Sequence, residues 1–398
     1  MTGLEIAQAG GACAFTEEEH RRRVSALQTG MAREGFDGLL LSGAADIFYV
    51  TGFLTRFWES PTRPWFVVVP AKGDPVAVIP SIGAALMGRS WLSDIRTWPS
   101  PRPEDEGISQ LIEALGDVTP GNGRIGAPLG QETRLGLPLL DFERVRTALA
   151  PRRIVDATAL LREARAVKSE AEIARMAQAV AAADAAFETM GRIAAPGVAL
   201  SAVFREVQIA CLAAGADWVA YLAGAAGPDG YQDVIAPADE SALSVGDVLM
   251  LDLGAVSGGY YCDFGRNIAI GPASLEAHRA YAALFAATEA GIAAARPGAE
   301  GRQVHAAMIA AIEEAGFAPL EGRHGHGIGL ALTEPPSLTA ADETVLREGM
   351  TLAIEPGLMI GPQAIMVHEE NIVVRSGGGA LLGARAPEAL PETSGAAR

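Results

Sequence analysis

The stretch VLMLDLGAVSGGYYCDFGRNIAI, residues 248–270, decides how this chain folds. It consists of two apolar runs separated by a glycine pair at 258–259. Two consecutive glycines favour a two-residue hairpin turn of the primed type, because both central positions of that turn need positive φ angles. We therefore predict an antiparallel hairpin in which Ser257 lies opposite Tyr260.

The predicted register places two aspartates on one face of this hairpin. Its strands should span residues 248–256 and 260–270, and the pairing that starts at the turn brings Gly254 opposite Asp263. Asp252 is two residues from Gly254, so its side chain shares a face with that of Asp263. We expect the two carboxylates to face a positive partner, and Gly254 to leave room beside them for an ion.

Three later segments carry residues of the same chemical kind. His326 lies in GHGIGL, Glu355 in LAIEPG and Glu369 in MVHEENIVV. Taken singly, a solvated aspartate or a capping histidine is an ordinary structural residue. Ionised side chains are nevertheless rare in apolar strands unless they are paired or bind a metal.

Four converging carboxylates would repel each other, and two divalent cations would cancel their charge. Oxygen-rich ligation with a single imidazole suits Mn, Co, Fe or Zn. The expected ligands are Asp252, Asp263, His326, Glu355 and Glu369.

These blocks occur in an order that resembles a known family. The chain is similar to the pita-bread metallohydrolases, which include prolidase, aminopeptidase P, methionine aminopeptidase and creatinase. The likeness covers roughly residues 165–385, while residues 15–160 resemble the extra N-terminal domain of the prolidase and creatinase branch. It rests on five motifs: Asp252-Leu-Gly, Tyr-x-x-Asp263-x-x-Arg266, Gly-His326-Gly-Ile-Gly-Leu, Ile-Glu355-Pro-Gly, and Glu369 ahead of an apolar strand.

The resemblance implies an α+β protein with two domains. Residues 163–398 would form the pita-bread fold, a bent antiparallel sheet covered by helices, which binds the metals. Residues 1–162 would form an α/β domain of the creatinase and prolidase type. Two capping boxes, Thr16-Glu-Glu-Glu19 and Ser169-Glu-Ala-Glu172, predict helix starts in the two parts. In the first part, the apolar run Ile47–Val50 predicts a strand.

The resemblance also implies a role for each expected ligand. Asp263 and Glu369 would bridge two metal ions, Asp252 would complete the shell of one, and His326 and Glu355 that of the other. A bridging hydroxide would attack a peptide or amide C–N bond, with Glu355 and His326 as catalytic residues and Glu355 as the proton shuttle. We therefore expect a dinuclear metallohydrolase of the Xaa-Pro peptidase type that acts on a short peptide or a small molecule.

Two positions depart from the prolidase pattern. Prolidases carry substrate-side histidines about seventeen residues before the first metal aspartate and just after the GIGL block, where this chain has Ile235 and Thr333. The departures leave open a hydrolase of a small non-peptide compound, a metal-assisted lyase similar to dimethylsulfoniopropionate lyase, and an inactive binding module. The intact set of five ligands argues against the last alternative.

Four residues are candidate substrate contacts. They are His324 and Thr333 near the metal motifs, and Arg56 and Trp58 in the N-terminal part. Loop residues that combine charge with an aromatic ring favour recognition. The resemblance implies a homodimer in which these N-terminal residues approach the partner's metal site. A loop-stabilising role for His324 and simple core packing of Trp58 are the structural alternatives.

Composition excludes several other classes of protein. The 398 residues include 48 acidic and 31 Lys and Arg residues, which gives a formal net charge of −17. Nucleic acids and anionic membranes attract basic surfaces, so we expect neither as a partner. No apolar run reaches the length of a membrane span. Three cysteines without paired spacing, and no signal peptide pattern at the N-terminus, favour the cytoplasm.

Overall fold

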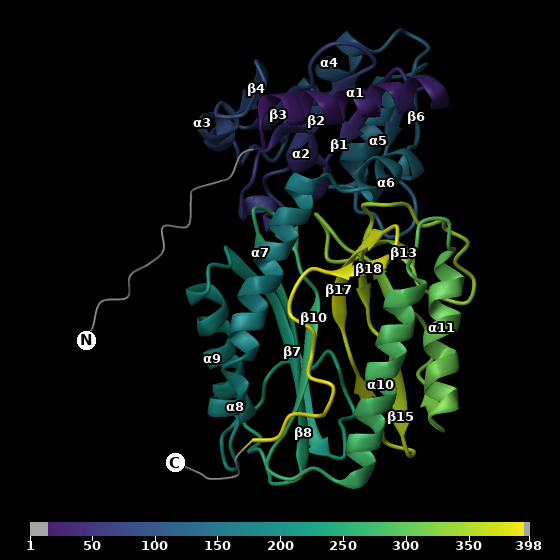
Figure 1. Cartoon of the computed structure of the whole chain (residues 1–398). Helices are drawn as coiled ribbons and strands as arrows, with labels where there is room; N and C mark the ends of the chain where they lie inside the picture. The colour runs from purple at the N-terminus through teal and green to yellow at the C-terminus, as the bar shows by residue number, and fades with distance from the viewer. Residues whose placement is uncertain (1–14, 394–398) are drawn as a thin grey trace. The chain divides into compact units, whose positions relative to one another are not determined.

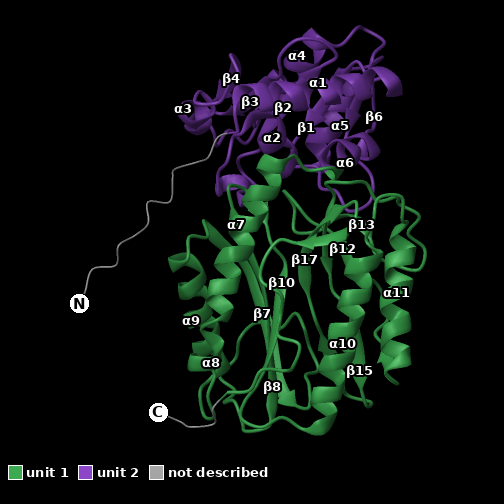
Figure 2. Cartoon of the chain, viewed as in Figure 1, with its two compact units in different colours: residues 1–11, 166–398 green, residues 12–165 purple. Residues whose placement is uncertain are grey.

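The computed structural model describes residues 15–393 and divides them into two compact units, coloured separately in Figure 2. Within the described part, the N-terminal unit runs to Arg165 and the C-terminal unit begins at Ala166. Among residues 15–393, no helix is both long and apolar enough to cross a bilayer.

The N-terminal unit is an α/β structure built on one mixed sheet. The six strands follow the order β4-β3-β2-β1-β5-β6 (Figure 1). They are β1 Gly38–Leu41, β2 Phe66–Pro70, β3 Val76–Pro80, β4 Asp94–Trp98, β5 Arg124–Ala127 and β6 Arg153–Asp156. Helical segments connect them: α1 Glu17–Glu34, α2 Ala44–Thr51, η1 Phe57–Glu59, η2 Ser81–Gly83, α3 Ala84–Met87, α4 Ile108–Val118, α5 Leu139–Ala148 and α6 Thr158–Ala166.

The strand predicted at Ile47–Val50 is wrong, because these residues belong to helix α2. All four are buried. A buried apolar run of four residues fits a helix as well as a strand, and periodicity cannot separate the two. The helix ends at Gly52, whose φ of 75° is left-handed and whose N–H donates to the carbonyl oxygen of Phe48.

The C-terminal unit has its strands between two groups of helices (Figure 1). Helices α7 Glu170–Phe187, α8 Met190–Ile193 and α9 Leu200–Ala213 form one group, and α10 Leu275–Ala294 and α11 Gly301–Glu314 form the other. The first group shares a hydrophobic core with the sheet β10-β8-β7, and the second shares a core with residues of β8 and β10 and with strands of the other two sheets. This arrangement confirms the predicted α+β class.

The strands of this unit form three sheets. The first follows the order β10-β8-β7, with β9 paired to β8, the second β11-β15-β16 and the third β13-β12-β14-β17-β18. Their bounds are β7 Trp218–Pro228, β8 Asp247–Ser257, β9 Tyr260–Tyr261, β10 Phe264–Ala269, β11 Ala318–Pro319, β12 Gly325–Gly327, β13 Glu334–Ser337, β14 Thr351–Ile354, β15 Gly357–Ile360, β16 Ala364–Val367, β17 Glu370–Arg375 and β18 Gly378–Leu381.

The hairpin of β8 with β9 and β10 has the predicted register. Gly258 and Gly259 have φ angles of 57° and 85°, as a primed turn requires, and Ser257 pairs with Tyr260. The pairing resumes beyond Tyr261 with Phe264 opposite Leu253, without an inserted residue. Asp252 and Asp263 therefore keep the shared face that the sequence predicted.

Candidate metal centre

The five predicted ligands meet in two overlapping clusters. Asp263, His326 and Glu355 form one, and Asp252, Asp263 and Glu369 form the other. Within each cluster, one potential ligand atom per residue lies within 4.8 Å of the others. Because Asp263 belongs to both clusters, the arrangement offers two neighbouring cation positions with one shared carboxylate.

Each of these side chains lies within a strand or close to the end of one. Asp252 lies within β8, and Asp263 lies between β9 and β10. His326 is central in β12, opposite Ala353 of β14, while Glu355 directly follows β14 and Glu369 directly precedes β17. Because β12, β14 and β17 are adjacent in one antiparallel sheet, three residues far apart in the sequence are brought together.

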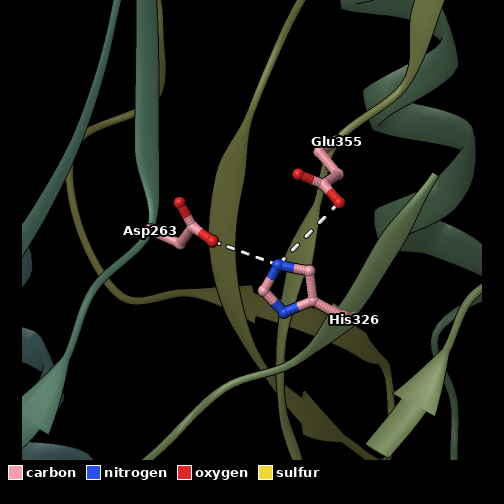
Figure 3. Close-up of side chains that lie close together, drawn as sticks. All are labelled: Asp263, His326 and Glu355. Carbon is pink, nitrogen blue, oxygen red and sulfur yellow. Dashed lines mark ion pairs between the residues drawn. The ribbon is translucent and has the colours of Figure 1, made fainter. Parts of the chain in front are cut away.

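His326 is oriented by its own main chain. Its Nδ1 atom lies 2.8 Å from the carbonyl oxygen of Gly327. A carbonyl only accepts, so Nδ1 carries the hydrogen and Nε2 presents a lone pair in the neutral ring. Figure 3 shows Asp263 and Glu355 pointing toward Nε2, at 3.0 Å and 3.8 Å. Such an imidazole is prepared to bind a cation through Nε2.

The carboxylates carry a strong electrostatic penalty when no cation is present. Burial, and next the charge of Asp263, raise the pKa of Asp252 and of Glu369 well above the usual carboxyl range. Burial also raises the pKa of Glu355, although the neighbouring His326 lowers it. For His326, burial lowers the pKa, but the hydrogen bond to Asp263 and the charge of Glu355 outweigh burial and raise it. Positive charge would relieve this strain.

The donor set fits divalent cations. Oxygen Oε1 of Glu369 is buried and has no hydrogen-bond partner among the described residues. A buried carboxylate oxygen without a donor is costly, and a cation would satisfy it. Four carboxylates and one imidazole are hard or borderline ligands, as Mn, Co, Fe and Zn accept. The residues therefore fit the metal ions that the sequence predicted.

Tyr221 is a site residue that the sequence analysis missed. It lies on β7, and its hydroxyl donates to Oδ1 of Asp252 at 2.7 Å and also contacts the carboxylate of Asp263. Its ring lies against Gly254, where a Cβ atom would clash with it. The expectation that Gly254 leaves room for an ion is therefore wrong, because the Tyr221 ring fills that space.

A second layer of side chains supports the ligands from behind. Asn371 accepts from the main-chain N–H of Asp263 at 3.1 Å and donates to the Asp263 carbonyl oxygen. Arg266 donates to the main-chain oxygen of Glu369 at 2.8 Å and pairs with the buried carboxylate of Glu370 at 3.2 Å. Arg266, which ends the Tyr-x-x-Asp263-x-x-Arg266 motif, thus holds the Glu369 main chain and shares the Glu370 carboxylate with Arg385.

The predicted substrate contacts near the metal motifs have different surroundings. His324 is buried, its Nε2 lies 2.9 Å from the Leu320 carbonyl oxygen, and its Nδ1 accepts from the N–H of Gly357 at 3.3 Å. Main-chain groups thus engage both ring nitrogens, as the loop-stabilising alternative expects. Thr333 lies just before β13, and Oγ1 is 3.5 Å from a guanidinium nitrogen of Arg323.

Arg323 is a second residue that the sequence analysis did not single out. Its Nε atom lies 3.6 Å from Oε1 of Glu355. Ile235, at the position where prolidases carry a histidine, is 82% exposed. The structure therefore puts an arginine beside Thr333.

The other two candidate contacts belong to the N-terminal unit. The ring of Trp58 packs edge-on against Phe53 and Trp65, with centroid distances of 5.5 Å and 5.8 Å, as the core-packing alternative expects. Arg56 is exposed and forms a loose ion pair of 4.0 Å with Glu59. Substrate recognition by Arg56 and Trp58 stays a prediction.

Comparison with known proteins agrees with the site geometry. Residues 174–376 match metallopeptidase family M24, and residues 23–167 match the creatinase/prolidase N-terminal domain. A probable dipeptidase PepE from Mycobacterium tuberculosis is 30% identical over 93% of this chain and 96% of its own length. The ectoine hydrolase of Halomonas elongata is 25% identical over 91% and 95%, respectively. The crystal structure of dipeptidase PepE from Mycobacterium ulcerans superposes with a TM-score of 0.82 at 30% identity, covering 95% of this chain and 99% of that one.

These matches extend over both units and confirm the expected pita-bread fold with its creatinase-type N-terminal domain. They also confirm the prediction of an enzyme, since the relatives of this length are named as peptidases and hydrolases. The chain belongs to metallopeptidase family M24 and is a metallohydrolase of that family.

Proposed function

We propose that this protein is a dinuclear metal-dependent hydrolase that cleaves a C–N bond in a short peptide or a small amide. The observation that carries the proposal is the shared position of Asp263 in two three-residue clusters. One carboxylate common to two ligand groups favours paired cations, and the buried, unpartnered oxygen of Glu369 supports the same view.

Each ligand has a proposed place around the two ions. Asp263 and Glu369 would bridge them, Asp252 would complete one shell, and His326 and Glu355 the other. Mn, Co, Fe and Zn all suit this set. When bound, the two cations would supply Lewis acidity, which polarises a substrate oxygen and makes water a better nucleophile.

Glu355 is the proposed proton carrier. Its side chain is 26% exposed, whereas that of Asp263 is 8% exposed, so Glu355 is the more accessible to an entering substrate. Glu355 would accept a proton from the attacking water and pass it to the leaving nitrogen. His326 would fix the geometry of this step from its buried position.

The substrate side favours a small amide over a proline dipeptide. The imidazoles expected near Ile235 and Thr333 are replaced by an exposed alkyl side chain and a hydroxyl. The curated relatives include dipeptidases and an ectoine hydrolase, so peptide and non-peptide amides are both represented among similar chains. A small non-peptide amide is therefore a candidate substrate ahead of a proline dipeptide, and a metal-assisted lyase reaction is the alternative chemistry.

We further propose a cytoplasmic homodimer, as the family resemblance implies. In such a dimer Arg56 and Trp58 would approach the metal site of the partner and supply a positive charge and an aromatic wall. A crystal structure of the dimer with both side chains far from either metal site would contradict this arrangement.

The test combines metal analysis with turnover on a substrate panel. Protein loaded with Mn, Co or Zn should hold two ions per chain and hydrolyse at least one member of a panel of dipeptides and small amides. Asp263→Asn should lose one or both ions and nearly all turnover. Glu313→Gln, which removes an exposed carboxylate on α11, is the matched control and should change neither. Full metal content and activity in Asp263→Asn would overturn the proposal.

A further inference from the structure

Arg323 is a partly exposed cation beside the metal centre. It lies in the loop between β11 and β12, three residues before His326. Its side chain is 38% exposed, and its guanidinium group reaches Glu355 and Thr333. No step of the proposed hydrolysis uses this residue, which leaves its positive charge to be explained.

The base of the Arg323 side chain is held firmly. The next residue, His324, donates its main-chain N–H to Leu338 at 2.9 Å and accepts from the N–H of Glu355 at 3.2 Å. Its ring is fixed at both nitrogens. Because His324 is held by these hydrogen bonds, the main chain of the adjacent Arg323 has a defined position. The Arg323 guanidinium group is therefore kept close to Glu355 and Thr333.

The contacts of the guanidinium group itself are loose. Its distances to Glu355 and Thr333 are 3.6 Å and 3.5 Å, whereas charge-assisted hydrogen bonds are usually about 2.7–2.9 Å. Between the residues that the structure describes, Arg323 makes no other ion pair or hydrogen bond. Arginine has five N–H donors, so most of its capacity for hydrogen bonds is available.

The other cations around the site are committed to buried partners. Lys168 pairs with Glu334 at 3.0 Å, with side-chain exposures of 2% and 4%. Arg266 pairs with Glu370, whose side chain is 1% exposed. Turning either of them toward a substrate would break an ion pair with a buried carboxylate, which is costly. Arg323 can do so, because its partner Glu355 would share its charge with a bound divalent cation.

We propose that Arg323 binds a carboxylate group of the substrate and so makes the enzyme selective for acids over their neutral amides. This inference rests on the proposed function. Arginine forms a two-donor fork that matches a carboxylate, and it does not release its proton near neutral pH. Beside Thr333, where prolidases carry a histidine that can transfer a proton, Arg323 would instead bind the negative charge of the substrate.

The experiment compares two ligands that differ in one group. Glycyl-L-leucine and glycyl-L-leucinamide share every feature except the terminal carboxylate, which is a neutral amide in the second. Calorimetric titration of the Mn-loaded enzyme should give at least about tenfold tighter binding of the acid, as expected for hydrogen bonds to a charged group. Arg323→Met should reduce this preference to less than about threefold. Arg323→Lys keeps the charge but loses the fork, and should lie between these values.

The control and the metal content make the outcomes decisive. Arg279→Met removes another exposed arginine of the same unit, with a side-chain exposure of 55%, and should keep the full preference. All variants should retain the Mn content of the wild type. An unchanged preference in Arg323→Met, equal binding of both ligands by the wild type, or loss of metal in Arg323→Met would each overturn the proposal. The proposed function has a separate test, because it fails on the metal content and turnover of Asp263→Asn.

Discussion

Removing the metal ions should destabilise the protein, and the loss should grow as the pH rises. Without cations, the pKa values of Asp252, Glu355 and Glu369 are raised, first of all by burial. Raised carboxyl pKa values mean that the folded state binds more protons than the unfolded state between the unfolded and folded pKa values. Stability then falls as the pH increases through this window. The raised pKa of His326 has the same sign, since its contribution is complete below the unfolded pKa and is lost above the folded one.

The size of the effect follows from metal binding. One cation at a concentration of 100 times its Kd stabilises the folded state by about 2.7 kcal/mol, so two independent ions would contribute roughly 5 kcal/mol. For a unit of this size, each kcal/mol corresponds to about 2–4 °C in Tm. We therefore expect EDTA treatment to lower the Tm of the C-terminal unit by roughly 10–20 °C at pH 8. The difference should be smaller at pH 5.5.

Differential scanning calorimetry of EDTA-treated and Mn-reloaded protein at pH 5.5, 6.5 and 8 measures this directly. Asp263→Asn serves as the control, because a variant without one of its ions should show a smaller gap between the two preparations. Equal Tm values with and without metal, or a gap that narrows toward pH 8, would refute the reasoning.

Four further predictions can be checked separately. Glu369→Gln should lose at least one metal ion and about 100-fold or more in kcat/KM, measured by metal analysis and steady-state kinetics. Lys168→Met should cost roughly 3–5 kcal/mol in the free energy of unfolding, because it removes the cation that is paired with the buried carboxylate of Glu334; urea titration measures this. Xaa-Pro dipeptides should be turned over with kcat/KM below about 10⁴ M⁻¹s⁻¹, and a higher value would restore ordinary prolidase specificity. Sedimentation at micromolar concentration should show a dimer, and a monomer would contradict the proposed assembly.

The pita-bread fold was predicted from the family resemblance, whereas the hairpin at the metal site could be predicted from the residues because its signals are local. The glycine pair at 258–259 determines the turn, and the period of two in a strand then determines that Asp252 and Asp263 share a face. The apolar flanks of Glu355 and Glu369 mark carboxylates that need a positive partner. Such inferences require only short stretches of sequence, and the structure agrees with the predicted register.

The missed features depend on long-range geometry. Tyr221 reaches the aspartates from β7, where the register shifts between Val219 and Tyr221, and an irregularity of this kind changes which side chains face the site. The contact of Arg323 with Glu355 depends on how a loop lies against the end of another strand. Helix α2 was missed because a four-residue apolar run does not identify its own secondary structure.

Asn371 has a consequence for the rigidity of the metal centre. Asp263 lies between β9 and β10, and the side chain of Asn371, on the neighbouring β17, takes both main-chain hydrogen bonds there. The Asn371 amide therefore links two separate sheets through two hydrogen bonds at Asp263, the residue shared by both clusters. Sliding of one sheet against the other would have to break these hydrogen bonds before it changed the spacing of the ligands. In the proposed dinuclear site, the stiffness of this sheet junction would set the spacing of the ligands and so of the cations, and an enzyme without this amide should hold its ions at a more variable separation.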